Sequence, residues 1–196
     1  MAKETMKAAV LVGPSHIEVK DVPVPEMEPD LLKIRVSACG LCGSDVHMWK
    51  SGEGWAPAGE EGFWMGHEFC GVVTDPGESD FKIDDRVTFW ANLYCGECDM
   101  CQAGQEQLCR DVNGTNYIGF VCDGAYAEQF VGKASNAYLL PDGVSDVAAG
   151  CIDPLWSRIM PFIAAASRCM IKFWSLAVGS LDSSSENWRK NPEQAT

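Results

Sequence analysis

The chain has 196 residues, a length that allows one domain with a substantial core and a small appendage. Its 46% hydrophobic content and mixed charges are typical of a globular protein, not of a disordered one. The net charge of −13 argues against nucleic acid as a partner, because binding a phosphate backbone needs Lys and Arg side chains. The N-terminus has no apolar core of signal-peptide length, so we expect a cytoplasmic protein.

The composition changes near residue 155. Up to Leu155 the chain has 10 basic and 25 acidic residues, whereas from Trp156 onward it has 5 basic and 3 acidic residues. We therefore predict a domain over residues 1–155 and a tail over 156–196, to which we assign no fold. The tail is a poor membrane span, because the charges of Arg158, Arg168 and Lys172 interrupt its apolar stretch.

Short strands separated by Gly and Pro turns are predicted along the first part of the chain. The apolar or alternating runs cover residues 7–12, 17–20, 32–38, 69–73, 86–89 and 125–131. In the third run, alternate residues share one face: Leu32, Ile34, Val36 and Ala38. No βαβ alternation is present, so the pattern indicates a mainly β barrel or sandwich.

Four cysteines lie in the middle of the chain at spacings of three, three and eight: Cys95, Cys98, Cys101 and Cys109. Four thiols so spaced can close around one tetrahedral ion, as in a structural zinc site. The bound thiolates are deprotonated, and holding the ion also holds the loop. Two disulfides are the alternative, but paired Cys-x-x-Cys steps in an intracellular chain favour metal. We predict a structural zinc ion here.

A second set of metal-ligating residues is divided between two segments. Cys42 lies within residues 39–47, directly after the third predicted strand, and His67 and Glu68 lie within residues 66–69. A Cys, a His and acidic groups in two separated loops can make an open zinc site that leaves a position for water or substrate. Each segment alone is more often structural. Two of the three His in the chain fall in these segments, which favours the zinc site.

These motifs resemble those of the zinc-dependent medium-chain alcohol and polyol dehydrogenases. Three of them match in order and spacing: Gly40-x-Cys42-Gly43-Ser44-Asp45, then Gly66-His67-Glu68, then the four-cysteine segment. Asp85-Arg86-Val87 also matches, with Asp84 where the family usually has Gly. The resemblance covers residues 6–155 and implies the catalytic domain of that family. This domain is a GroES-like, partly open β-barrel with a zinc-binding lobe.

The resemblance implies a catalytic zinc ion held by Cys42 and His67. Glu68 would be a further ligand, or a close neighbour that exchanges with water. In the polyol branch of the family another acidic residue near the zinc lies in a Glu-Pro-Leu segment. This chain has Asp-Pro-Leu there, one methylene shorter, so Asp153 is the candidate. In the alcohol branch a Cys serves instead, and Cys151 keeps that choice open.

The resemblance also implies the rest of the chemistry. Ser44 matches the hydroxyl that relays the substrate proton, and His47 would extend this relay. Asp45 would orient the His67 ring through its second nitrogen, as metal-bound imidazoles usually need. Zinc acts as a Lewis acid on the substrate oxygen, and the hydride needs NAD or NADP to receive it. The expected reaction is oxidation of a small secondary alcohol or polyol to a ketone.

The nicotinamide partner raises a difficulty. A dehydrogenase of this family needs a Rossmann domain with a Gly-x-Gly-x-x-Gly motif, and the 196 residues contain no such motif. We therefore expect a chain that is inactive alone, without its Rossmann domain. The alternative is a stand-alone zinc-binding module that associates with a partner subunit. Homo-oligomer formation, which in this family relies partly on the Rossmann domain, stays open.

The tail offers an explanation for the missing motif. We back-translated residues 170–183 and read from the third base of each codon. The shifted frame permits Asp-Lys-Val-Leu-Val-Val-Gly-x-Gly-Ile-Ile-Gly-Leu, and its Asp and first Leu are forced whatever codons are used. This is a Val-rich strand running into the dinucleotide-binding motif. We hypothesise that the tail is a frameshifted remnant of a Rossmann domain.

Overall fold

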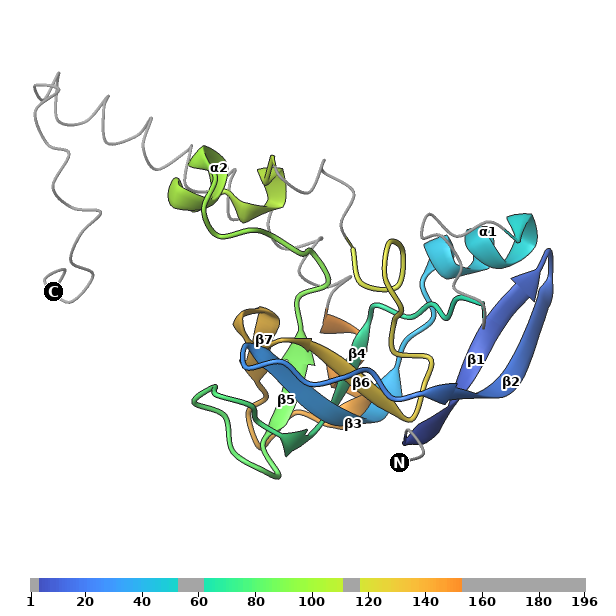
Figure 1. Cartoon of the computed structure of the whole chain (residues 1–196), viewed down its shortest axis with the longest axis horizontal. Coiled ribbons are helices and arrows are strands. Elements are labelled where there is room, and N and C mark those ends of the chain that lie inside the picture. The colour runs from blue at the N-terminus through green and yellow to red at the C-terminus, as the bar shows by residue number, and fades with distance from the viewer. Residues whose placement is uncertain (1–3, 53–61, 111–116, 153–196) are drawn as a thin grey trace, which may run out of the picture. The chain divides into compact units, whose positions relative to one another are not determined.

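The computed structural model of the chain describes residues 4–52, 62–110 and 117–152 (Figure 1). The chain divides into two units, Met1–Pro154 and Leu155–Thr196, and every described residue belongs to the first. The tail and Asp153 lie outside the described residues, so what the sequence predicts for them stays a prediction.

Antiparallel pairing builds two sheets. β1 (Thr5–Gly13) and β2 (His16–Pro23) form a hairpin. The larger sheet has the strand order β6-β3-β4-β5-β7 and is open, not closed into a barrel. Its strands are β3 (Leu31–Cys39), β4 (Phe69–Asp75), β5 (Arg86–Phe89), β6 (Gln129–Lys133) and β7 (Ala137–Leu139). The prediction of a mainly β fold is confirmed.

Five of the six predicted strands lie within β1 to β5. The sixth prediction, residues 125–131, is wrong at its start, because β6 begins only at Gln129. The backbone amides of Ala125 and Tyr126 instead bond to the carbonyls of Gly66 and Met65, beside the start of β4. This loop is therefore used to hold the segment that carries His67.

The main hydrophobic core contains three aromatic rings from β4, β5 and β6. The centroids of Phe69, Phe89 and Phe130 lie 4.7 to 5.4 Å apart, in stacked and edge-on pairs. Aromatic pairs in such arrangements contribute free energy beyond their burial. Phe69 is 1% exposed and directly follows His67 and Glu68, so the core fixes the position of both candidate ligands.

The predicted face of β3 is only partly right. Leu32 and Ile34 are fully buried in the main core, as the alternation predicts. The register of β3 against β4 shifts between Val36 and Ala38, and Ala38 packs instead against a separate cluster that includes Cys70. A one-residue shift turns a side chain to the other face of a sheet. Alternation in the sequence cannot show such a bulge.

Short helices carry or approach the candidate ligands. α1 (Gly43–Ser51) follows β3 and begins directly after Cys42, so the prediction of a loop in this segment is wrong. The four-cysteine segment forms a lobe with α2 (Asp99–Gln102) and the 3-10 helix η1 (Glu106–Leu108), apart from the strands in Figure 1. A second 3-10 helix, η2 (Ala134–Asn136), precedes β7, and α3 (Asp146–Ala149) follows it. Within the described ranges, no helix is long and apolar enough to cross a membrane.

Candidate metal centres

The sulfur atoms of the lobe cysteines lie at the corners of a small tetrahedron. The Sγ separations are 3.9 Å for Cys95 and Cys101, and 3.5 Å for Cys98 and Cys101. They are 3.9 Å for Cys98 and Cys109, and 3.5 Å for Cys95 and Cys109. Four sulfurs about 2.3 Å from a zinc ion are about 3.8 Å apart, whereas a disulfide needs about 2.05 Å. The separations fit a zinc ion and not disulfides.

Backbone amides point at these sulfurs. The Cys95 amide donates to Cys109 Sγ at 3.3 Å, and the amides of Glu97 and Cys98 donate to Cys95 Sγ at 3.4 and 3.3 Å. Hydrogen bonds from the Arg110 and Cys101 backbone, with smaller contributions from the neighbouring thiols, lower the pKa of the Cys98 thiol to about 6. Donated hydrogen bonds favour the thiolate, which is the form that binds metal.

A buried asparagine joins the lobe to the sheet, and the sequence analysis missed it. Asn136 is 0% exposed, and its amide nitrogen donates to the carbonyls of Trp90 at 2.9 Å and Asn92 at 2.8 Å. The backbone carbonyl of Asn136 accepts from the Trp90 backbone amide at 2.8 Å. The side-chain amide of Asn92 in turn donates to the Glu106 backbone carbonyl at 3.3 Å. A single Asn in the sequence carries no signal for such a role.

The second set of predicted ligands also comes together. One ligand atom each of Cys42, His67 and Glu68 lies within 4.8 Å of the others. Cys42 precedes α1, and the other two directly precede β4, where they are 5% and 7% exposed. A thiolate, an imidazole and a carboxylate form a donor set that suits zinc, and three protein ligands leave a coordination position open.

A fully buried carboxylate, that of Asp45, contacts two of these three residues. Asp45 Oδ1 lies 3.6 Å from His67 Nδ1, which leaves Nε2 of the ring for a metal. Asp45 Oδ2 accepts from the Cys42 amide at 2.9 Å and is 3.0 Å from the Tyr126 hydroxyl. Burial lowers the pKa of His67, but the Asp45 carboxylate outweighs it and raises this pKa to about 9. Burial conversely raises the pKa of Asp45, but the nearby His67 ring and the hydrogen bond from the Cys42 amide bring it below its usual value.

Among the described residues, three buried polar atoms at this site have no hydrogen-bond partner: Ser44 Oγ, Asp45 Oδ1 and His67 Nδ1. Asp45 Oδ1 and His67 Nδ1 face each other at 3.6 Å, so neither of them indicates a group from outside the chain. Buried hydroxyls are normally paired, so the Ser44 hydroxyl fits a hydroxyl-bearing ligand, and the donors of Cys42, His67 and Glu68 fit a zinc ion. His47, by contrast, is exposed on α1.

The chain returns to this site before Asp153. A Cβ on Gly40 would lie 2.7 Å from the Gly150 carbonyl oxygen and 2.9 Å from Glu68 Oε2, so only glycine fits there. Asp153 itself lies outside the described residues, and Cys151 is exposed. The choice between them as a further ligand therefore stays open.

Two aromatic residues contact the site without having been predicted. The Phe120 ring lies 4.9 Å from the His67 ring, tilted by 55°. Tyr126 bonds to Asp45, 81 residues earlier in the chain. Both come from the segment between the lobe and β6, where nothing in the sequence distinguishes them from core aromatics.

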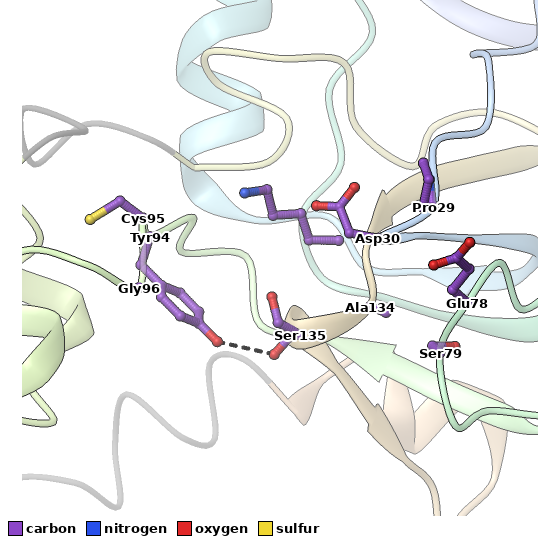
Figure 2. A pocket seen from close by; sticks show the side chains of 10 residues that line it. Pro29, Asp30, Glu78, Ser79, Tyr94, Cys95, Gly96, Ala134 and Ser135 are labelled. Carbon is purple, nitrogen blue, oxygen red and sulfur yellow. Dashed lines mark hydrogen bonds between the residues drawn. The ribbon is translucent and has the colours of Figure 1, made fainter.

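One cavity lies elsewhere, beside the lobe. It has a volume of about 540 Å³ and is lined on one side by Asp30 and Glu78 and on the other by Tyr94 and Cys95 (Figure 2). The Tyr94 hydroxyl donates to the Ser135 carbonyl at 3.2 Å, across its edge. Of the candidate ligands only Cys95 lines this cavity, so it is not the open metal site.

Known proteins are similar to this chain in both sequence and fold. Residues 28–142 match the family model of the alcohol dehydrogenase GroES-like domain. L-threonine 3-dehydrogenase of Chromobacterium violaceum is 36% identical over 157 residues, 79% of this chain and 45% of that protein. Sorbitol dehydrogenase of Bacillus subtilis is 34% identical over 155 residues, 77% of this chain and 43% of that protein.

A solved structure agrees. The cobalt- and zinc-bound thermostable alcohol dehydrogenase of Pyrobaculum aerophilum matches with a TM-score of 0.67 and 29% identity, over 76% of this chain and 45% of that one. The chain spans less than half the length of the relatives that it matches. The family match, the fold and the two groups of metal-ligating residues agree, and the chain belongs to the medium-chain alcohol dehydrogenase family, as its GroES-like N-terminal domain.

Proposed function

We propose that this chain is the catalytic domain of a zinc-dependent, NAD(P)-linked dehydrogenase that oxidises small secondary alcohols or polyols to ketones. The observation that carries the proposal is the group of Cys42, His67 and Glu68, whose ligand atoms lie within 4.8 Å of one another. Beside it lies the unpartnered Ser44 hydroxyl.

The three residues of the group would act together as metal ligands. Cys42, His67 and Glu68 would hold the zinc ion, with Asp153 or Cys151 as the candidate for a further ligand. When bound, zinc supplies the Lewis acid that lowers the pKa of the substrate hydroxyl.

The groups around the ligands would handle the proton. Asp45 accepts from the Cys42 amide and faces His67 Nδ1, so it holds the ring with Nε2 free. The Ser44 hydroxyl would take the substrate proton, and the exposed His47 would pass it to solvent. NAD or NADP, when bound, would supply the hydride acceptor.

The proposed substrate class is based on the compounds for which the matched relatives are named. Threonine and sorbitol each carry a secondary hydroxyl beside other polar groups, and the matched relatives are named as dehydrogenases of these compounds. We infer a small polar secondary alcohol for this chain.

The 196-residue polypeptide by itself should hold zinc without oxidising alcohols, because it contains no Gly-x-Gly-x-x-Gly motif. We place the protein in the cytoplasm, because the separations of the lobe sulfurs fit a metal ion and not disulfides, as expected in a reducing compartment.

The proposal is tested on the chain loaded with cobalt(II), whose absorption reports its ligands. Imidazole probes whether a coordination position is open, and sorbitol and L-threonine probe whether an alcohol enters it. We expect both kinds of molecule to change the spectrum of the unmodified chain and of Cys122→Ser, an exposed cysteine outside both metal groups. The Cys42→Ser variant, left with the lobe ion alone, should respond to neither.

The outcomes separate the two candidate functions. A response to imidazole but to none of the secondary alcohols favours the zinc-binding module that associates with a partner. No response to either contradicts an open metal site. Formation of reduced nicotinamide by the chain alone would contradict the expectation that it is inactive by itself.

A further inference from the structure

We infer that Tyr126 is a positioning residue for the open metal site and acts through Asp45. The inference rests on the proposed function, and it concerns a residue that lies 59 positions after His67 and is not a ligand. Its hydroxyl lies 3.0 Å from Asp45 Oδ2 and 3.0 Å from the Gly40 carbonyl oxygen.

The first step concerns the two oxygens of Asp45. A carboxylate that orients an imidazole must keep one oxygen toward the ring, and rotation about its last bond would remove that oxygen. Oδ2 is held by the Cys42 amide at 2.9 Å and by the Tyr126 hydroxyl. Oδ1 is thereby left facing His67 Nδ1 at 3.6 Å. The hydroxyl has a single proton, and the charged carboxylate is a stronger acceptor than the Gly40 carbonyl.

The second step concerns where the Tyr126 ring lies. A Cβ on Gly66 would come within 2.8 Å of Tyr126 Cδ1, so the ring packs directly against the residue before His67. The Tyr126 amide also donates to the Met65 carbonyl at 2.9 Å. The backbone of Tyr126 is therefore anchored to the His67 segment while its hydroxyl reaches the α1 segment.

The third step is the consequence. The ligands Cys42 and His67 come from separate segments, and Asp45 contacts both. Tyr126 holds that carboxylate at Oδ2, the oxygen that also accepts from the Cys42 amide, so the hydroxyl helps to fix the two ligands relative to each other. Groups hydrogen-bonded directly to a metal ligand typically change metal affinity or activity by about 10- to 100-fold when they are removed, and Tyr126 acts one contact further out, on Asp45.

The test is a competition titration of zinc against a chromophoric chelator. Tyr126→Phe keeps the ring against Gly66 and removes only the hydroxyl. Tyr94→Phe is the matched control, because the Tyr94 hydroxyl bonds to the Ser135 carbonyl and to nothing at the open site. We expect the affinity of the open site to fall by up to about tenfold in Tyr126→Phe, because the hydroxyl acts one contact beyond the direct partner of the ligand. The lobe site should be unchanged, and Tyr94→Phe should match the unmodified chain.

A double variant separates positioning from packing. If Tyr126 acts through the carboxylate, Tyr126→Phe should have a much smaller effect when Asp45→Asn is already present. The cobalt(II) spectrum of the open site should also shift in Tyr126→Phe, because the imidazole is no longer held in one orientation. The same loss with and without Asp45→Asn, or no loss at all, would overturn the inference. A single metal per unmodified chain, bound only in the lobe, would instead overturn the proposed function, and this inference with it.

Discussion

Gly66 occupies a backbone conformation and a space that no other residue fits. Its φ is +98°, and an added Cβ would lie 2.8 Å from Tyr126 Cδ1 and 2.9 Å from Cys39 Sγ. Glycine adopts such φ values without the clash that a side chain brings. The residue directly before His67 therefore sets the direction in which that ligand leaves the turn.

We predict that Gly66→Ala destabilises the domain by about 2 kcal/mol or more, because strain at φ and the clash both add to the cost. Gly143→Ala is the matched control: its Cβ meets nothing within 4 Å. Urea denaturation followed by tryptophan fluorescence measures both. Equal midpoints for the two variants would contradict the prediction.

The charge state of His67 links metal binding to pH. Burial favours the neutral ring, but Asp45 outweighs it and raises the pKa of His67 to about 9, so the metal-free ring is protonated at neutral pH. A metal ion binds the neutral imidazole and must displace that proton.

We therefore predict that zinc affinity at the open site rises with pH below about 9, by about tenfold per pH unit for each proton displaced. Asp45→Asn removes the carboxylate that raises the pKa, so this variant should displace one proton fewer near pH 8. Competition titrations at several pH values give the slopes. The same slope in both proteins would contradict this account of His67.

At the scale of elements, an ion pair ties β5 to the segment that leads back to the metal site. Arg86 Nη2 donates to the Val144 carbonyl at 2.6 Å and to Asp146 Oδ1 at 2.5 Å. The turn of α3 that follows places Gly150 against Gly40. The sequence marks Arg86 only as part of a motif, and the structure shows what it holds.

Arg86→Ala should lower the free energy of unfolding by about 1–2 kcal/mol, since the side chain is only partly exposed and loses two hydrogen bonds. Arg110→Ala offers a matched comparison, because its ion pair with Asp99 is 63% and 62% exposed. An exposed pair contributes about 0–1 kcal/mol. Denaturant titrations of both variants give the two losses in the free energy of unfolding. A larger loss in Arg110→Ala than in Arg86→Ala would contradict the prediction.

At the scale of the whole molecule, local patterns predicted most of what the structure shows. Short apolar or alternating runs located β1 to β5, because this signal lies within a few residues, although β2 is exposed over most of its length. The spacing of the lobe cysteines predicted their convergence, since a short loop leaves them few other arrangements. The open site gave a weaker signal, because its two segments are 25 residues apart: residue types indicated a zinc site, and the family resemblance then assigned the roles of the residues.

What the sequence could not show depends on contacts between distant residues. Tyr126 reaches Asp45 across 81 positions, and Asn136 reaches Asn92 across 44. The bulge in β3 and the late start of β6 arise from pairing with other strands and loops, not from local preference. Sequence periodicity carries no information about such pairs.

The central claim is that one domain holds a closed structural zinc ion and an open catalytic one. The most direct test is the zinc content of the purified chain by mass spectrometry, for the unmodified protein, Cys42→Ser and Cys98→Ser. We predict about two zinc ions per chain, falling by one in each variant, because the two sites share no ligand. A single zinc ion that Cys42→Ser leaves in place would contradict the open site, and with it the proposal that this domain carries out catalysis.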